Sequence, residues 1–146
     1  MNQYIKQYQK NQIETASQEQ ILIMLYNGAI QFLNLARKAM EEKNIQEIHN
    51  NIIGAQKIIR EFQATLDMEN GGELAQRLYG LYAYLHKKLV NANINKNMED
   101  LEEVLDYMKD LRDTWAQAIQ IAQKEKASVS DEEPAEESHD WSVGEE

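Results

Sequence analysis

The sequence predicts an all-α protein, an antiparallel up-down-up-down four-helix bundle with a short N-terminal lid segment and a disordered acidic C-terminal tail. Apolar residues recur at helical spacing through residues 18–126. Polar breaks interrupt that spacing at Lys43-Asn44, Asn70-Gly71-Gly72 and Asn95-Lys96-Asn97. Three breaks delimit four helices, at about residues 18–43, 45–68, 72–95 and 98–126. Because the connections are short, consecutive helices are expected to run antiparallel.

Composition supports one helical domain, residues 1–127. The first 16 residues of this domain are the predicted lid. The chain has 146 residues, no Cys and one Pro. This length allows a self-sufficient core, and the absence of Cys excludes disulfides. The N-terminus lacks the apolar core of a secretory signal, and no run approaches the roughly 18 apolar residues of a membrane span. We therefore expect a cytoplasmic protein without membrane insertion.

The negative charge is concentrated at the C-terminal end. Residues 128–146 hold eight of the 25 acids and no Lys or Arg, which leaves 17 acids against 15 bases in residues 1–127. A segment this acidic and poor in apolar residues, which also holds the only Pro, is expected to be disordered. Neither part supplies the basic stripe that phosphate binding needs, which argues against nucleic acid as a partner.

The first helix carries more apolar residues than one core can cover. It begins with a capping box, since Ser17 is followed three residues later by Gln20. The stretch from Ile21 to Tyr26 is then apolar at six consecutive positions. Its outward members must be covered by the N-terminal segment, by a second copy or by a partner. The amphipathic residues of that N-terminal segment are Tyr4, Ile5, Tyr8 and Ile13.

The other three helices show cleaner apolar stripes. The second begins at Asn44, with Glu47 three residues later, and Gly71-Gly72 tolerate positive φ where it must stop. The stripe of the fourth, from Leu101 to Ala122, is wide enough for a globular bundle. The third has a leucine stripe from Leu74 to Leu89. The seam of the second alternates spacings of three and four: Ile45, Ile48, Ile52, Ala55, Ile59, Phe62 and Leu66.

The sequence argues against an enzyme, a cofactor and a metal site. A di-iron bundle needs Glu-x-x-His pairs on facing helices, and neither His49 nor His86, the histidines of the predicted helices, has Glu three residues before it. No phosphate-binding glycine loop, H-E-x-x-H or G-x-S-x-G motif is present. Because the chain has no Cys, thiol catalysis and a cysteine zinc site are also excluded.

Two further features leave alternatives open. Tyr79, Tyr82 and Tyr84 accompany the leucine stripe of the third helix, either with rings at the core edge and hydroxyls in water or as the wall of a groove. Gly28 and Ala29 lie mid-helix, where Gly costs about 1 kcal/mol relative to Ala. They indicate close approach of another backbone, either a neighbouring helix or a partner on a groove floor.

Motifs spread over residues 4–122 resemble the flagellar secretion chaperone family, FliS. Gln18 departs from the Pro that the family often has there, and the acidic tail has no counterpart in the resemblance. The motifs are, in order, Thr15-Ala16-Ser17, Leu25-Tyr26-Asn27-Gly28-Ala29-Ile30, Ile58-Ile59, Leu66-Asp67, Gly71-Gly72-Glu73, Leu81-Tyr82-Ala83-Tyr84, Leu89, Ala92-Asn93 and Trp115.

The resemblance implies a function. It implies a cytoplasmic chaperone that binds the C-terminal segment of flagellin one-to-one, prevents its premature polymerisation and delivers it to the flagellar type III export apparatus, with the export gate as a further partner. From another class, the alternative is a self-associating helical structural or adaptor protein with no flagellin client, a homodimer when free.

With flagellin as the client, helix-in-groove binding is the expected mode, and a displaceable lid is expected over part of the groove. The predicted set is Tyr4, Ile5, Tyr8 and Ile13 in the lid, with Leu22, Leu25, Tyr26, Ala29, Leu33, Tyr79 and Tyr82 in the groove.

Overall fold

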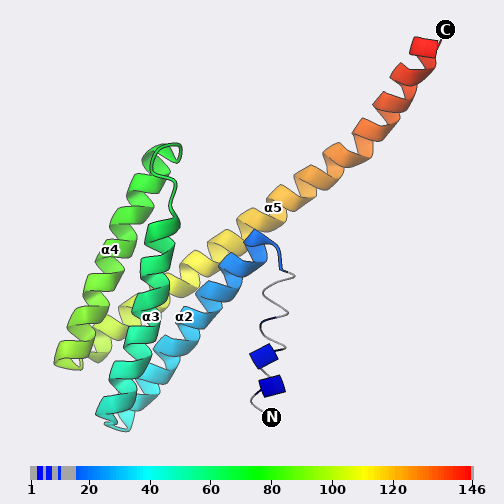
Figure 1. The fold of residues 1–146 in the computed structure, drawn as a ribbon. Coiled ribbons are helices and arrows are strands. Elements are labelled where there is room, and N and C mark those ends of the chain that lie inside the picture. The colour runs from blue at the N-terminus through cyan, green and yellow to red at the C-terminus, as the bar shows by residue number, and fades with distance from the viewer. Residues whose placement is uncertain (1–2, 5, 8–9, 11–15, 146) are drawn as a thin grey trace. The chain divides into compact units, whose positions relative to one another are not determined.

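A computed structural model of the chain describes residues 3, 4, 6, 7, 10 and 16–145, with side chains as far as residue 129. Its long helices are α2 (Gln18–Glu41), α3 (Ile45–Thr65), α4 (Gly72–Asn95) and α5 (Met98–Glu145). No strand occurs among the described residues. The predicted all-α class with four helices is therefore confirmed (Figure 1).

The chain divides into two compact units, residues 1–112 and residues 113–146. The bundle belongs to the first unit, which contains α2, α3, α4 and the first 15 residues of α5, from Met98 to Arg112. These helices alternate in direction along the chain, in the predicted up-down-up-down order (Figure 1).

Local side-chain chemistry sets where α2 and α3 begin. The Ser17 hydroxyl accepts the backbone N–H of Gln20 at 3.2 Å, and the Gln20 side chain accepts the N–H of Ser17 at 3.0 Å. The Asn44 side chain accepts the N–H of Glu47 at 3.2 Å. Both predicted caps are therefore present, and each satisfies a backbone donor that the first helical turn leaves unpaired.

The connection between α3 and α4 is longer than predicted. Helix α3 ends at Thr65, three residues earlier than expected, because Leu66 takes an extended conformation with ψ of 134°. Gly72 then has φ of +59°, a left-handed conformation that glycine adopts without a steric penalty.

The core is formed by the middle of each predicted stripe. On α3 the seam residues Ile48, Ile52, Ala55, Ile59 and Phe62 are buried, whereas Ile45 at the start of the seam is 61% exposed. On α4 Leu85, Leu89 and Ala92 are buried, whereas Leu74 is 61% exposed. The stripe therefore predicts the buried face in the middle of each helix but not at its start, where on α4 Ala75 is buried in place of Leu74.

A polar network joins α4 to the first part of α5. Lys88 pairs with Asp100 at 3.2 Å and with Glu103 at 3.6 Å, and the Tyr84 hydroxyl donates to Glu103. The Asn91 amide also donates to Asp100, and this bond and that from Lys88 lower the pKa of the Asp100 carboxyl. These contacts lie at the rim of the bundle, and so they orient the two helices more than they stabilise them.

The last helix extends beyond the boundary that the sequence predicted. The prediction ended it at about residue 126 and expected disorder from residue 128, whereas the backbone of α5 is helical to Glu145. Glutamate, which favours helix, occurs five times in residues 127–145, and the prediction weighed its charge but not this preference. Side chains beyond residue 129 lie outside the description, so disorder of the tail stays a prediction.

Candidate partner-binding surface

Four of the residues predicted for the groove are core residues in this structure. Tyr26, Ala29 and Leu33 have no exposed surface, and Tyr82 is 3% exposed. Tyr26 and Tyr82 face one another across the bundle, with the Phe62 ring stacked on Tyr26 at a centroid distance of 4.4 Å. A partner can touch these four side chains only if the helices around them move apart. These four side chains therefore lie in the core of this structure, and their contact with a client stays a prediction.

The half-exposed start of α2 is the accessible part of the predicted groove. Each of the five residues from Ile21 to Leu25 is half-buried, including the predicted Leu22 and Leu25. Apolar side chains at five consecutive positions point in every direction around a helix. The structure therefore leaves the apolar surplus of α2 only partly covered, as the sequence predicted.

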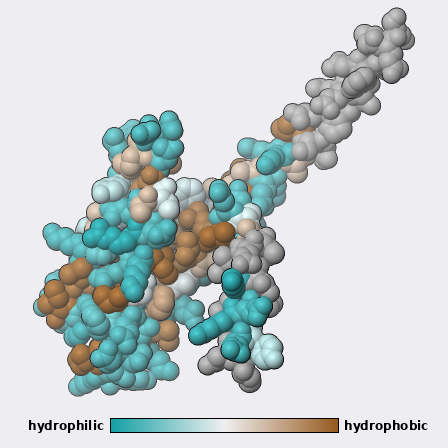
Figure 2. Space-filling model, in the orientation of Figure 1, coloured by the Kyte–Doolittle hydropathy of each residue, from teal (hydrophilic) through white to brown (hydrophobic). Residues whose placement is uncertain are grey.

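The outer side of α4 also carries apolar side chains. Tyr79, another predicted groove residue, is 46% exposed, and its carbonyl accepts the buried Gln63 amide at 3.3 Å. Farther along α4, Val90 is 37% and Ile94 is 74% exposed. Figure 2 shows apolar colour at this end of α4 and near the start of α3. Val90 and Ile94 were not predicted as surface residues.

The predicted lid is only partly described. Tyr4 lies in helical backbone and is 80% exposed, so its ring covers nothing in this structure. The other predicted lid residues, Ile5, Tyr8 and Ile13, lie outside the described residues. The lid therefore stays a prediction.

The predicted small residues of α2 do not both mark a close approach. A Cβ added to Gly28 would meet only the Ile58 side chain, at an ordinary contact distance of 3.5 Å. The tight approach between α2 and α3 is instead at Gly54, where an added Cβ would stand 2.8 Å from the Phe32 ring. Periodicity could not indicate this position, because it depends on which residue of α2 lies opposite.

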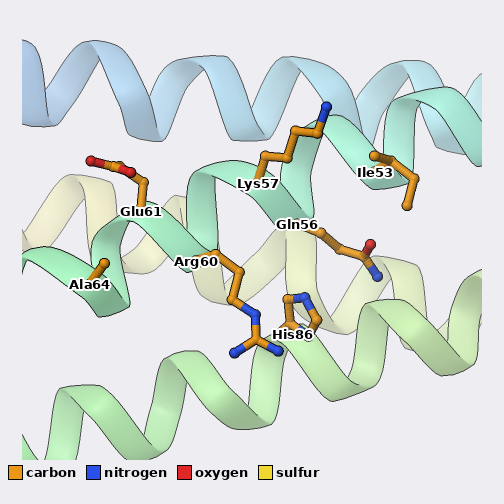
Figure 3. Close-up of a pocket in the computed structure, with 7 residues that line it drawn as sticks. All are labelled: Ile53, Gln56, Lys57, Arg60, Glu61, Ala64 and His86. Atoms are coloured by element: carbon orange, nitrogen blue, oxygen red, sulfur yellow. The ribbon is translucent and has the colours of Figure 1, made fainter.

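Two hollows flank the outward face of α3, and the sequence reasoning missed both. One, of about 520 Å³, lies between α3 and α4 (Figure 3), and the other, of about 500 Å³, lies between α2 and α3. Ile53 and Lys57 line both of them. The remaining lining residues of the first are Gln56, Arg60, Glu61, Ala64 and His86, and those of the second are Phe32, His49, Asn50, Gly54 and Ile58.

The two histidines whose side chains the structure describes, His49 and His86, lie on facing sides of α3 and α4. His49 shares a 2.9 Å hydrogen bond between its Nδ1 and the Asn93 amide, which ties α3 to α4. Burial, and secondly the nearby positive charge of Arg60, lowers the pKa of His86. Among the described residues no group of three His, Cys, Asp or Glu side chains could hold a metal ion. Within the same residues, no helix is both long and apolar enough to cross a membrane.

Comparisons with known proteins agree on one family. A family model described as flagellar protein FliS matches residues 1–122. The flagellar secretion chaperone FliS of Bacillus subtilis (strain 168) is 39% identical over 119 residues, covering 82% of this chain and 88% of that protein. The flagellar secretion chaperone FliS of Salmonella typhimurium is 32% identical over 118 residues, covering 77% and 87%.

The fold agrees as well. A solved structure described as a flagellar chaperone from bacteria superposes with a TM-score of 0.66 at 19% identity, over 81% of this chain and 96% of that one. The relatives are named as chaperones, which is a non-enzymatic role and agrees with the predicted absence of catalysis. With the family model spanning most of the chain, this protein belongs to the FliS family of flagellar secretion chaperones.

Proposed function

We propose that this protein is a cytoplasmic export chaperone for flagellin. It binds the C-terminal segment of flagellin one-to-one, prevents that segment from polymerising early and delivers the subunit to the flagellar type III export apparatus. Membership of the FliS family supports a chaperone role in flagellar secretion. The client, the binding segment and the export gate as a partner are the parts that we infer.

The half-covered apolar start of α2 is the observation that carries the proposal. Monomeric proteins rarely leave contiguous apolar surface without a use. Here the five residues from Ile21 to Leu25 retain exposed surface beside a fully buried Tyr26. An amphipathic segment can lay its apolar face on such a helix, in the mode by which helices bind grooves.

The chemistry of the complex suits temporary protection. A client segment that orders only on binding spends part of the interaction energy on its own ordering, so it can be covered over a large area and still be released. The residues at the start of the chain, Tyr4, Ile5, Tyr8 and Ile13, are proposed to lie on the same apolar surface in the free protein. Client binding would then displace them.

Light scattering coupled to size exclusion tests the proposal. The protein is measured alone, with flagellin, and with flagellin that lacks its C-terminal segment. A one-to-one complex with intact flagellin only is expected. A chain without residues 128–146 should bind flagellin equally well, since the groove lies in residues 1–127.

Two results would contradict the proposal. The first is a stable homodimer that ignores flagellin, which would assign the apolar start of α2 to self-association. The second is a complex that survives removal of the flagellin C-terminal segment but is lost with residues 128–146, which would assign binding to the tail.

A further inference from the structure

The outward face of α3 combines two hollows with positively charged side chains. Ile53 and Lys57 line both hollows, so the two hollows meet along this helix. Arg60 follows Lys57 three residues later, but the two side chains diverge: Figure 3 shows Lys57 extending towards α2 and Arg60 towards α4. His86 lies beside Arg60, on α4. The whole chain has a net charge of −10, so a group of positively charged side chains is unusual on its surface.

Arg60 is held in position by a short chain of hydrogen bonds. Its guanidinium donates to the Gln63 side-chain oxygen at 3.1 Å, and the Gln63 amide donates to the Tyr79 carbonyl at 3.3 Å. Gln63 is only 8% exposed, so this support is anchored in the bundle. Figure 3 shows Arg60 extending from α3 towards α4, beside the ring of His86.

The cationic groups of this face have room for acidic partners. Among the described residues, neither Lys57 nor Arg60 forms an ion pair, and His86 has no hydrogen-bond partner. Glu61 is the one acid that lines either hollow, and Figure 3 shows its carboxylate pointing away from His86. Arginine presents several N–H donors in a planar fork that fits a carboxylate.

We propose that the α3 face, defined by Ile53, Lys57, Arg60 and His86, docks an acidic amphipathic helix of a second protein. This face is distinct from the proposed flagellin site on α2. Acids along one edge of that helix meet Lys57, acids along its other edge meet Arg60, and an apolar side chain enters at Ile53. A helical partner fits because an amphipathic helix carries polar residues on both sides of its apolar stripe, as the two diverging cations require. A nucleic acid is disfavoured, because two cations beside Glu61 in a chain of net charge −10 cannot offset many phosphates.

The same geometry couples docking to protonation of His86. The charged group beside its ring is Arg60 on α3; Lys57 and Glu61 line the same hollow but point away from the ring. In the free protein, burial and the charge of Arg60 lower the pKa of His86 and favour the neutral ring. A bound carboxylate cancels part of the Arg60 field and so raises the pKa of His86. Docking therefore takes up protons and strengthens as the pH falls from about 8 to 6, where Glu side chains remain ionised.

Fluorescence anisotropy with two designed peptides tests the docking. The labelled peptides are amphipathic helices with the same apolar face, one with Glu and the other with Lys along its edge. The full chain is expected to bind the Glu peptide at least about 10-fold more tightly. Lys57→Glu and Arg60→Gln should each remove most of this preference, whereas Lys38→Glu, an equal charge change on exposed α2 surface, should not.

The coupling has its own control. His86→Gln should abolish the rise in affinity between pH 8 and 6, and His49→Gln should retain it. Equal binding of the two peptides, equal effects of Lys57→Glu and Lys38→Glu, or comparable binding of a single-stranded oligonucleotide would each overturn the assignment. Circular dichroism establishes that every variant is folded. Because flagellin is absent from the assay, its outcome is independent of the proposed flagellin site.

Discussion

The hydroxyl groups of Tyr26 on α2 and Tyr82 on α4 lie 2.8 Å apart in the core of the bundle and share a hydrogen bond. The two residues are 56 positions apart in the sequence, and both rings pack against Phe62 of α3, at centroid distances of 4.4 Å and 5.6 Å. The buried polar contact thus joins α2 to α4, and ring packing joins both to α3. A hydroxyl in this position must be paired, since a buried donor without a partner is costly.

Removal of the Tyr26 hydroxyl is expected to destabilise the bundle. Tyr26→Phe keeps the ring but leaves the Tyr82 hydroxyl without its partner, at a cost of about 1–3 kcal/mol in the free energy of unfolding by urea. Tyr79→Phe is the control, since Tyr79 is 46% exposed and should change stability by less than about 0.5 kcal/mol. Equal effects of the two substitutions would show that the buried pair has no special role.

Tyr82 should also make the fold sensitive to alkali. Burial raises the pKa of the Tyr82 hydroxyl, and the hydrogen bond from Tyr26 opposes this shift more weakly. Below the ordinary phenol pKa of about 10, both the folded and unfolded states are protonated and the stabilisation is complete. Above it, the unfolded chain ionises first, so stability falls as the pH rises towards the raised folded pKa.

Chemical denaturation between pH 8 and 11 measures this loss. The slope of stability against pH should be shallower in Tyr82→Phe than in the unchanged protein. Tyr84→Phe is the comparison: the pKa of this exposed phenol is raised chiefly by its bond to Glu103, so its removal should flatten the slope less than Tyr82→Phe does. An unchanged slope in Tyr82→Phe would contradict the prediction.

Two glycines in helices should respond oppositely to alanine. At Gly80 an added Cβ meets nothing within 4 Å, so Gly80→Ala should stabilise the protein by about 1 kcal/mol through helix propensity. At Gly54 the Cβ would stand 2.8 Å from three carbons of the Phe32 ring, and overpacking costs about 1–3 kcal/mol. Thermal unfolding of both variants compares them, and an equal gain at Gly54 would refute the close approach of α2.

The capping box of α2 should contribute measurably to stability. Ser17→Ala removes the acceptor for the Gln20 N–H and is expected to cost about 1 kcal/mol in urea unfolding. Ser17→Gly should cost only a few tenths, because glycine suits the N-cap backbone. If Ser17→Ala unfolds at the same urea concentration as the unchanged protein, the start of α2 is frayed in solution.

Flagellin binding should depend on the exposed start of α2. Leu22→Gln and Leu25→Gln each replace a half-exposed apolar contact and should weaken binding by about 10-fold in calorimetry. Leu35→Gln is the matched control, since Leu35 is also on α2 and is 44% exposed. Equal loss in all three variants would indicate a general effect on α2 and contradict this location of the site.

The helical domain was largely predictable because its signals are local. Caps at Ser17 and Asn44 act within one turn, and the apolar spacing of α3 marks its inward face without reference to any neighbour. Family membership was likewise readable from motifs in order along the chain. The extent of α5 was not predictable, since the helical preference of Glu favours helix whereas the concentrated charge of the tail favours disorder.

The sequence by itself determined the four helices, their order and the excess of apolar residues on α2, since these follow from periodicity and composition. Only the tertiary structure decided that Tyr26, Ala29 and Leu33 are buried while the residues from Ile21 to Leu25 remain half-exposed. Burial depends on which residues of other helices lie opposite. The Tyr26–Tyr82 bond and the α3 face exist for the same reason, because each joins side chains of different helices that no local pattern relates.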